Sequence, residues 1–360
     1  MKYILIFVFV LIQSTIFAQK TDSIPSTIFS WGTQLHYGSI FAHSEAVENT
    51  AGSRPFGIQV DAVWQKISQK VWDNCNCSPK TGISLSYYNY DNRYLGHSIN
   101  AGYFLEPNFK LLKNWDVSLR GTFGLSYLTN PYDSIRNPNN QSYSLPMSVY
   151  LGVGIGNHFK ITPQLKIGLY LNYQHISNGG LKDPNKGINW ITTSLGLFYT
   201  PKLIEIPVKE RKVFERNKPI QIEIFGFVSN KAARVGDKNR HFILGTGLQI
   251  SKQVSRLSSL LVGSEICYDG ATAQRMEYDN IKGNAWSVGL LAGHQFLLGK
   301  FTFSQQIGVY LYQNNPYFDA WYHRWGIMYY PSKKIGVGFN LKVHRHIANF
   351  GDVRISYRLK

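Results

Sequence analysis

Segments of about ten residues in which apolar and polar side chains alternate recur along the chain, and this pattern constrains the fold most strongly. Between Met147 and Gly156, the odd positions hold Met, Val, Leu, Val and Ile, whereas the even positions hold Ser, Tyr and Gly. Successive side chains of a β-strand point to opposite faces, so each segment predicts a strand with one apolar and one polar face. The polar faces, rich in Gly, Ser, Asn and Arg, are too polar for the packed core of a soluble sandwich. Long alternating strands of this kind are typical of transmembrane β-barrels.

The grouping of these segments predicts how the strands divide. We count eight between Trp31 and Tyr199 and about eight more after residue 220. Over residues 201–219 the alternation stops and charged residues crowd together. The sequence therefore predicts an all-β fold of antiparallel transmembrane β-barrels, with an eight-stranded barrel over residues 19–204, a charged linker over 205–219 and a second barrel-like half over 220–360. One larger barrel of about sixteen strands also has the even strand number of such proteins, although the charged break favours two.

The amino-terminal residues predict export. An apolar run from Tyr3 follows Met1 and Lys2 and ends in Ala18, which is typical of a secretory signal peptide over residues 1–18. No cysteine follows the predicted cleavage site, so we expect no lipoprotein anchor. No later segment is apolar for the 18 or so residues that a transmembrane helix needs. The predicted location is the outer membrane of a Gram-negative bacterium.

The net charge and the cysteine content limit which binding partners, metals and cofactors we expect. The formal net charge of +17 favours an anionic membrane surface, such as one that carries lipid phosphates. Nucleic acid is not expected, because the predicted exported chain has no basic cluster on a helix. The pair Cys75 and Cys77 is too small a set for a zinc site, and Cys267 lies far away, so we predict no metal and no cofactor. A loop disulfide and unpaired thiols both remain open for these cysteines.

One strand end carries a candidate catalytic pair. In the segment from Lys166 to Ser177, the apolar odd positions end in His175 and Ser177. Residues two apart on a strand share a face with Cα atoms about 6.6 Å apart, so their side chains can meet. The returning strand begins at Asn189, whose side chain is expected on the same face. Long loops alternate with shorter ones, and outer-membrane barrels keep their longer loops outside, which places Ser177 near the outer leaflet.

These residue types match a serine nucleophile and its base. A serine hydroxyl becomes a strong nucleophile when a neighbouring base takes its proton, and His175 is the candidate base. Asn189 can orient the imidazole through its carbonyl oxygen, but it brings no negative charge. In the loop that follows, residues Asn178, Gly179, Gly180 and Asn185 are the candidate oxyanion or substrate contacts, since backbone amides and a side-chain amide can stabilise an oxyanion.

The longer string around this pair is more specific than the pair itself. His-x-Ser-Asn-Gly-Gly-Leu-Lys-x-Pro-Asn-x-Gly-x-Asn, from His175 to Asn189, resembles the signature of the PagL-type lipid A deacylases, also called acyloxyacyl hydrolases. The resemblance covers about residues 25–200, and the part from Trp72 to Tyr90 resembles versions from Bacteroidetes-type bacteria. It implies an outer-membrane β-barrel that hydrolyses the 3-O-linked acyl ester of lipid A, with lipopolysaccharide of the outer leaflet as its partner.

The resemblance also implies residue roles. The family's histidine and serine correspond to His175 and Ser177, and its oxyanion contacts correspond to Gly179 and Asn185. Its acid is a glutamate, and Asn189 stands at that position. This departure leaves three alternatives open: a slower enzyme, a different carboxylate such as Asp183 in the role of the acid, or an inactive site.

Other interpretations remain open from the sequence. A non-enzymatic barrel, either a channel or an envelope-structure protein, would keep the fold without the chemistry, and the same site could serve a phospholipid esterase. The second half could support a homodimer. Near the end of the chain, residues 346–349 echo the motif with Ala348 in place of the serine, which indicates either a duplicate without a nucleophile or chance. We expect this echo at the end of the penultimate strand.

Overall fold

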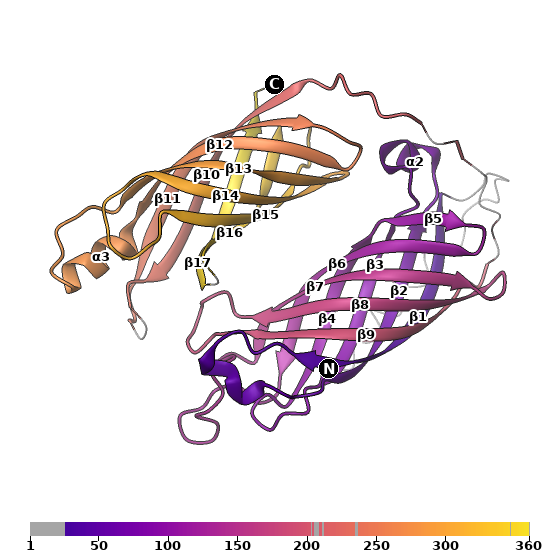
Figure 1. Cartoon of the computed structure of the whole chain (residues 1–360), viewed down its shortest axis with the longest axis horizontal. Helices are drawn as coiled ribbons and strands as arrows, with labels where there is room; N and C mark the ends of the chain where they lie inside the picture. The colour runs from indigo at the N-terminus through magenta and orange to yellow at the C-terminus, as the bar shows by residue number, and fades with distance from the viewer. Residues whose placement is uncertain are drawn as a thin grey trace, which may run out of the picture.

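Two closed β-barrels follow each other along the chain in the computed structural model (Figure 1). The structure describes residues 26–202, 204, 209–210, 212–234, 237–345 and 347–359. The predicted signal peptide, residues 1–18, and part of the predicted charged linker lie outside these residues. No helix among the described residues is long and apolar enough to cross a membrane.

The first barrel closes with eight strands. Its sheet has the order β4-β3-β2-β1-β9-β8-β7-β6, and β4 pairs with β6 to close the cylinder. The short β5 continues β4 beyond Pro107 along the same partner, because proline has no N–H to donate to the ladder. The strands are β1 (Thr27–Ile40), β2 (Phe56–Lys66), β3 (Lys80–Asn89), β4 (His97–Glu106), β5 (Asn108–Leu112), β6 (Trp115–Leu128), β7 (Met147–Lys160), β8 (Leu165–Ser177) and β9 (Ile188–Tyr199).

The second barrel also closes on itself, in the order β10 to β17, with β10 paired to β17. Its strands are β10 (Ile220–Ala232), β11 (Arg240–Gln253), β12 (Ser258–Asp269), β13 (Trp286–Leu298), β14 (Phe301–Gln313), β15 (Trp321–Tyr329), β16 (Ile335–His344) and β17 (Ile347–Arg358). The predicted all-β fold of two barrels is confirmed. The alternative of one larger barrel is wrong, because β1 pairs with β9 and β10 with β17, so each sheet forms a separate cylinder.

Side chains alternate between the two faces of each wall as the sequence pattern predicts. On β8, Leu169 and Leu171 are exposed on the outside, whereas Tyr170 and Gln174 are buried in the lumen. An apolar exterior and a polar interior are the pattern of a barrel whose outer surface meets lipid. The exterior of the cylinder is therefore the membrane-facing surface, and residues on it near a strand end lie close to the lipid head groups.

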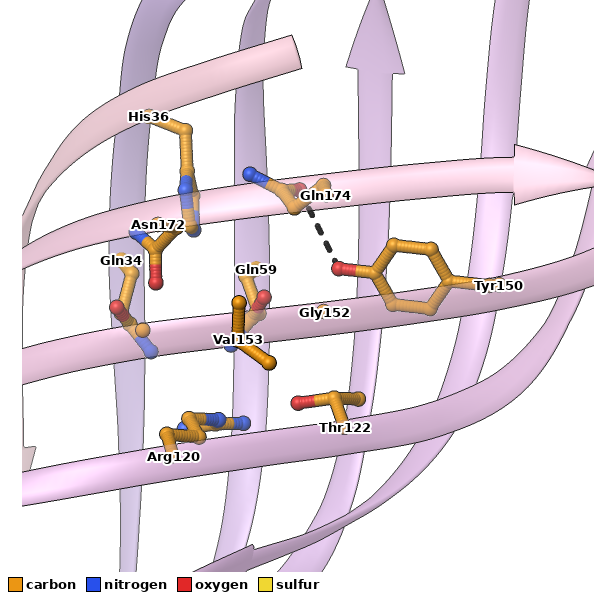
Figure 2. Close-up of a pocket in the computed structure, with 11 residues that line it drawn as sticks. Gln34, His36, Gln59, Arg120, Thr122, Tyr150, Gly152, Val153, Asn172 and Gln174 are labelled. Atoms are coloured by element: carbon orange, nitrogen blue, oxygen red, sulfur yellow. Dashed lines mark hydrogen bonds between the residues drawn. The ribbon is translucent and has the colours of Figure 1, made fainter. Parts of the chain in front are cut away.

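Ion pairs fill the lumen of the first barrel. The Arg120 guanidinium donates two hydrogen bonds to the Asp61 carboxylate, both 2.8 Å long. Further along the lumen, Lys80 and His158 each lie 3.0 Å from Oε1 of Glu106. Figure 2 shows Arg120 with neighbouring polar side chains, including Gln34 and Gln59, around a lumen cavity.

A hydrophobic cluster closes the end of this lumen that lies beneath the long loops. Its members are Ile40, Tyr88, Tyr90, Leu95, Leu128, Tyr143, Tyr150, Ile176, Ile188 and Trp190, all buried. Three of them, Ile176, Ile188 and Trp190, come from the ends of β8 and β9. The inward faces of these two strand ends are therefore anchored in a packed core, which holds their outward faces in place.

Within the described ranges, three short helices lie in connections rather than in the walls: η1 (Glu45–Thr50), α2 (Gln69–Cys75) and α3 (Gly270–Tyr278). Cys75, at the end of α2, forms a disulfide with Cys77, while Cys267 is buried and unpaired. The expected position of the motif echo is wrong. β16 ends at His344 and β17 begins at Ile347, so Ala348 lies on the last strand, and His346 lies outside the described residues.

Candidate active site

His175 and Ser177 project from the outer face of β8 at its loop end. They share this face with exposed Leu169, Leu171 and Tyr173, and both are themselves partly exposed. The distance between His175 Nε2 and Ser177 Oγ is 2.9 Å, which is a hydrogen bond. The strand geometry explains the contact, since residues two apart on one face lie side by side.

Asn189 lies directly opposite His175 in the register between β8 and β9. Its Oδ1 is 2.7 Å from His175 Nδ1, and it also accepts a 2.8 Å hydrogen bond from the Tyr173 hydroxyl. Because a carbonyl oxygen can only accept, Nδ1 of the imidazole carries the proton. Nε2 is then left with a lone pair, so Ser177 Oγ–H donates to it. This is the tautomer that a general base requires.

A second histidine, His43, contacts the other end of the Asn189 amide. Asn189 Nδ2 lies 2.9 Å from Nδ1 of His43, which comes from the loop between β1 and β2, just before η1. The same loop is tied down by a backbone hydrogen bond of 2.8 Å from Phe41 N–H to Asn189 O. With only 6% of its surface exposed, Asn189 is enclosed between the two histidines. We call the series Ser177, His175, Asn189 and His43 the rim relay.

The loop from residue 178 to residue 187, here the site loop, is organised by Asn178. Its Oδ1 accepts from the N–H groups of Gly180 and Leu181, at 3.0 and 3.1 Å. Its Nδ2 donates to Lys182 O, at 2.7 Å, and to Ser144 Oγ, at 3.3 Å. Asn178 is 3% exposed and all its side-chain polar atoms are bonded within the loops. The side chain of Asn178 therefore shapes the loop, and a contact of this residue with substrate or oxyanion stays a prediction.

Two amide groups near Ser177 remain available to a ligand. Asn185 Oδ1 accepts a 2.9 Å hydrogen bond from Asn178 N–H, the peptide that follows Ser177. Because that donor requires an oxygen, Asn185 Nδ2 faces away from it and has no hydrogen bond within the described residues. Gly179 N–H likewise has none there, whereas Gly180 N–H is committed to Asn178. Of the predicted oxyanion donors, the geometry therefore leaves Gly179 N–H and Asn185 Nδ2.

Gly187 closes the site loop against the imidazole. Its φ of +80° is left-handed, and a Cβ at this position would lie 2.8 Å from Cε1 of His175. Any other residue would therefore be strained and would displace the base. A neighbouring segment holds the loop in place, since Lys186 N–H and Gly187 N–H donate to the carbonyls of Gln141 and Ser142, at 3.0 and 2.7 Å.

Family models match both barrels. The family model described as lipid A 3-O-deacylase (PagL) matches residues 58–198. The model described as the C-terminal domain of acyloxyacyl hydrolase matches residues 220–360. The chain belongs to the PagL family. The two family models divide the chain at the same place as the two barrels do, so the second barrel is a recognised part of this family's architecture.

Two solved outer-membrane proteins match about half of the chain at low sequence identity. The outer membrane enzyme PagL is 16% identical, with 46% of this chain and 97% of that chain covered and a TM-score of 0.35. Neisserial surface protein A is 13% identical, with 48% of this chain and 96% of that chain covered and the same TM-score. No curated protein sequence matches the chain significantly.

The structure brings together most of the residues that the PagL-type signature singles out, and adds others. His175, Ser177 and Asn189 form one hydrogen-bonded series. Asp183 is exposed on the site loop and takes no part in that series. Sequence reasoning missed His43 as a partner, because no local pattern connects it with a residue 146 positions away. It also counted Tyr173 only as part of the apolar face, although the hydroxyl of that residue bonds Asn189. Among the described residues, no group of His, Cys, Asp and Glu could hold a metal ion.

Proposed function

We propose that the protein is an outer-membrane serine esterase that removes an ester-linked acyl chain from lipid A. The observation that supports this most is the position of the rim relay on the lipid-facing surface, at the loop end of the first barrel. An acyl ester of lipid A lies at the boundary between head group and hydrocarbon. A nucleophile at the rim, on the outside of the cylinder, meets that bond without the lipid entering the lumen.

The first chemical step is acylation. Ser177 Oγ attacks the ester carbonyl carbon, and His175 Nε2 takes the hydroxyl proton across the 2.9 Å hydrogen bond. The proton on Nδ1 stays bonded to Asn189 Oδ1, which holds the ring in its catalytic tautomer. Negative charge collects on the former carbonyl oxygen, where Gly179 N–H and Asn185 Nδ2 donate to it.

The intermediate then collapses. The bond between carbonyl carbon and sugar oxygen breaks, and His175 returns its proton to that oxygen, which leaves as the free hydroxyl of the sugar. Water enters the site and attacks the acylated Ser177, with His175 again as the base. The products are a fatty acid and a lipid A with one acyl chain fewer, and Ser177 is regenerated with its proton.

Lipid A fits the surroundings of the site better than an uncharged ester does. The exposed site loop carries Lys182 and Lys186 beside the rim relay, and the whole chain has a formal charge of +17. Cations on a surface attract phosphorylated lipids and raise their local concentration. The acyl chains of the substrate would lie along Leu169, Leu171 and Tyr173, which are exposed below the site.

The structure argues against a channel through the first barrel. The Arg120–Asp61 pair and the Glu106 cluster occupy its lumen, and the hydrophobic cluster closes one end. Opening a path would require buried ion pairs to separate, which is costly in a low-dielectric interior.

Mass spectrometry of lipid A tests the proposal. Cells that express the wild-type chain are expected to accumulate lipid A lacking one ester-linked acyl chain, whereas cells with Ser177→Ala keep the full set. Both proteins must be folded in the outer membrane, as judged by heat-modifiable migration. Identical acylation in the two strains rejects the enzyme, and loss of acyl chains from phospholipids alone rejects lipid A as the substrate.

A further inference from the structure

The family resemblance implies a glutamate at position 189, where this chain has an asparagine. Unlike a carboxylate, the side-chain amide of Asn189 must be held in one orientation. The two oxygens of a carboxylate are equivalent, so either can face the imidazole. An amide has one accepting end and one donating end. If Asn189 turned its Nδ2 toward His175, Nδ1 would have to accept, the proton would move to Nε2, and Ser177 could no longer pass its proton to that atom.

The contacts on the His175 side leave the orientation of the amide undecided. Tyr173 lies 2.8 Å from Asn189 Oδ1, but a hydroxyl can donate or accept, so it would tolerate either end. His175 could also bond either end, by changing tautomer. A contact on the far side of the amide is therefore needed to select the productive orientation.

His43 occupies that far side. Its Nδ1 lies 2.9 Å from Asn189 Nδ2, and the amide group is almost completely enclosed. His43 can also adopt either tautomer, and its Nδ1 accepts only in the Nε2–H form. In that form, the donating end of Asn189 is satisfied only when Oδ1 faces His175. A buried N–H without a partner is costly, so this contact favours one of the two orientations. The hydrogen bond from Phe41 N–H to Asn189 O holds the loop that carries His43 beside Asn189.

We infer that His43, in its Nε2–H tautomer, is a positioning residue that orients the Asn189 amide and thereby sets the reactive tautomer of His175. This inference rests on the proposed esterase function and adds a residue to it. His43 makes no contact with the reacting atoms and acts only through Asn189.

Paired substitutions at positions 43 and 189 test the inference. His43→Leu removes the acceptor, and we expect kcat for lipid A deacylation to fall about tenfold, because the unpaired N–H now favours the flipped amide. His43→Gln restores an acceptor through Oε1 and is expected to recover activity to within about threefold of wild type. In an Asn189→Asp background, the carboxylate has no orientation to select, so His43→Leu should change kcat by less than about twofold.

An equal loss from His43→Leu in both backgrounds would show that His43 only supports the loop, and would overturn the inference. No loss in the wild-type background would overturn it as well.

A second measurement does not depend on activity. In the full chain with Ser177→Ala, in detergent micelles, nitrogen-15 NMR of the imidazoles reports which ring nitrogen carries the proton. The signal of His175 is assigned by its disappearance in a His175→Gln variant. We expect the Nδ1–H tautomer with His43 present and a shift toward Nε2–H with His43→Leu. An unchanged tautomer contradicts the inference, whether or not the protein proves to be an esterase. Retention of full activity by Ser177→Ala would reject the proposed function and leave the tautomer result to stand by itself.

Discussion

Replacing Asn189 with aspartate adds a negative charge to the site with almost no change in shape. The new carboxylate would lie where Oδ1 now lies, 2.7 Å from His175 Nδ1. His175 and Tyr173 both donate to it, so its burial is compensated by hydrogen bonds. Its main effect is expected on the transition state, in which His175 becomes an imidazolium.

The size of this effect follows from the geometry. Two unit charges about 4 Å apart attract by about 4 kcal/mol at an effective dielectric constant of 20, and by about 1 kcal/mol in bulk water. The rim relay lies between these limits, because Asn189 is enclosed while His175 and Ser177 are partly exposed. A stabilisation of about 1.4 to 2.7 kcal/mol corresponds to a rise in kcat of about 10- to 100-fold. The carboxylate stabilises only the charged imidazolium, which forms in the transition state. We therefore expect kcat to rise and substrate affinity to stay the same.

The assay is single-turnover hydrolysis of lipid A by the refolded protein in mixed micelles. Asn185→Asp serves as a matched control, since it adds the same charge at the predicted oxyanion site, where it should lower kcat. If kcat is unchanged or lower in Asn189→Asp while the barrel stays folded, charge at this position does not limit the reaction and the electrostatic reasoning is refuted. A similar rise in both variants would mean that net charge, rather than the relay, is responsible.

Further predictions concern the site loop and the lumen. Gly187→Ala and Gly180→Ala both place a side chain at a φ near +80° and should each cost about 1 kcal/mol of stability. Only Gly187→Ala should also lower kcat, by at least about tenfold, because its Cβ would collide with the imidazole of His175. Urea unfolding and kinetics measured together separate these two effects, and equal kinetics in the two variants would contradict the predicted collision. Asp61→Asn removes the carboxylate that Arg120 bonds twice and leaves Glu106, 3.6 Å away, as the remaining counter-charge, so it should lower the free energy of unfolding by about 3 kcal/mol. A loss below about 1 kcal/mol, measured by urea unfolding in lipid vesicles, would show that lumen water compensates for the lost pair.

Local periodicity in the sequence was enough to predict the strands and the shared face of His175 and Ser177. His175 and Ser177 share a face because they are two residues apart, and that face is apolar because the preceding odd positions are Leu and Tyr. The position of Asn189 followed from the same rule applied to the returning strand. These features depend on backbone geometry that repeats every two residues, so any short segment contains them.

Periodicity could not show which amides in the site loop are available. Asn178 and Asn185 lie in one polar string and are chemically alike, yet one is fully bonded within the loops and the other retains a free donor. The difference arises from the turn that the loop adopts and from Ser144 on a neighbouring loop. Hydrogen-bond satisfaction is a property of all the groups around an atom, and these groups come from separate parts of the chain.

The amino-acid sequence alone determined that this protein is a lipid-facing β-barrel with a histidine and a serine side by side at one rim. Only the tertiary structure decided that the strands close into two cylinders, through the pairings of β1 with β9 and β10 with β17. It also brought His43 to Asn189 across 146 positions. The physical reason is the range of each interaction. Side-chain alternation is set between neighbouring residues, whereas barrel closure and the contact between loops depend on segments that meet only after the chain has folded.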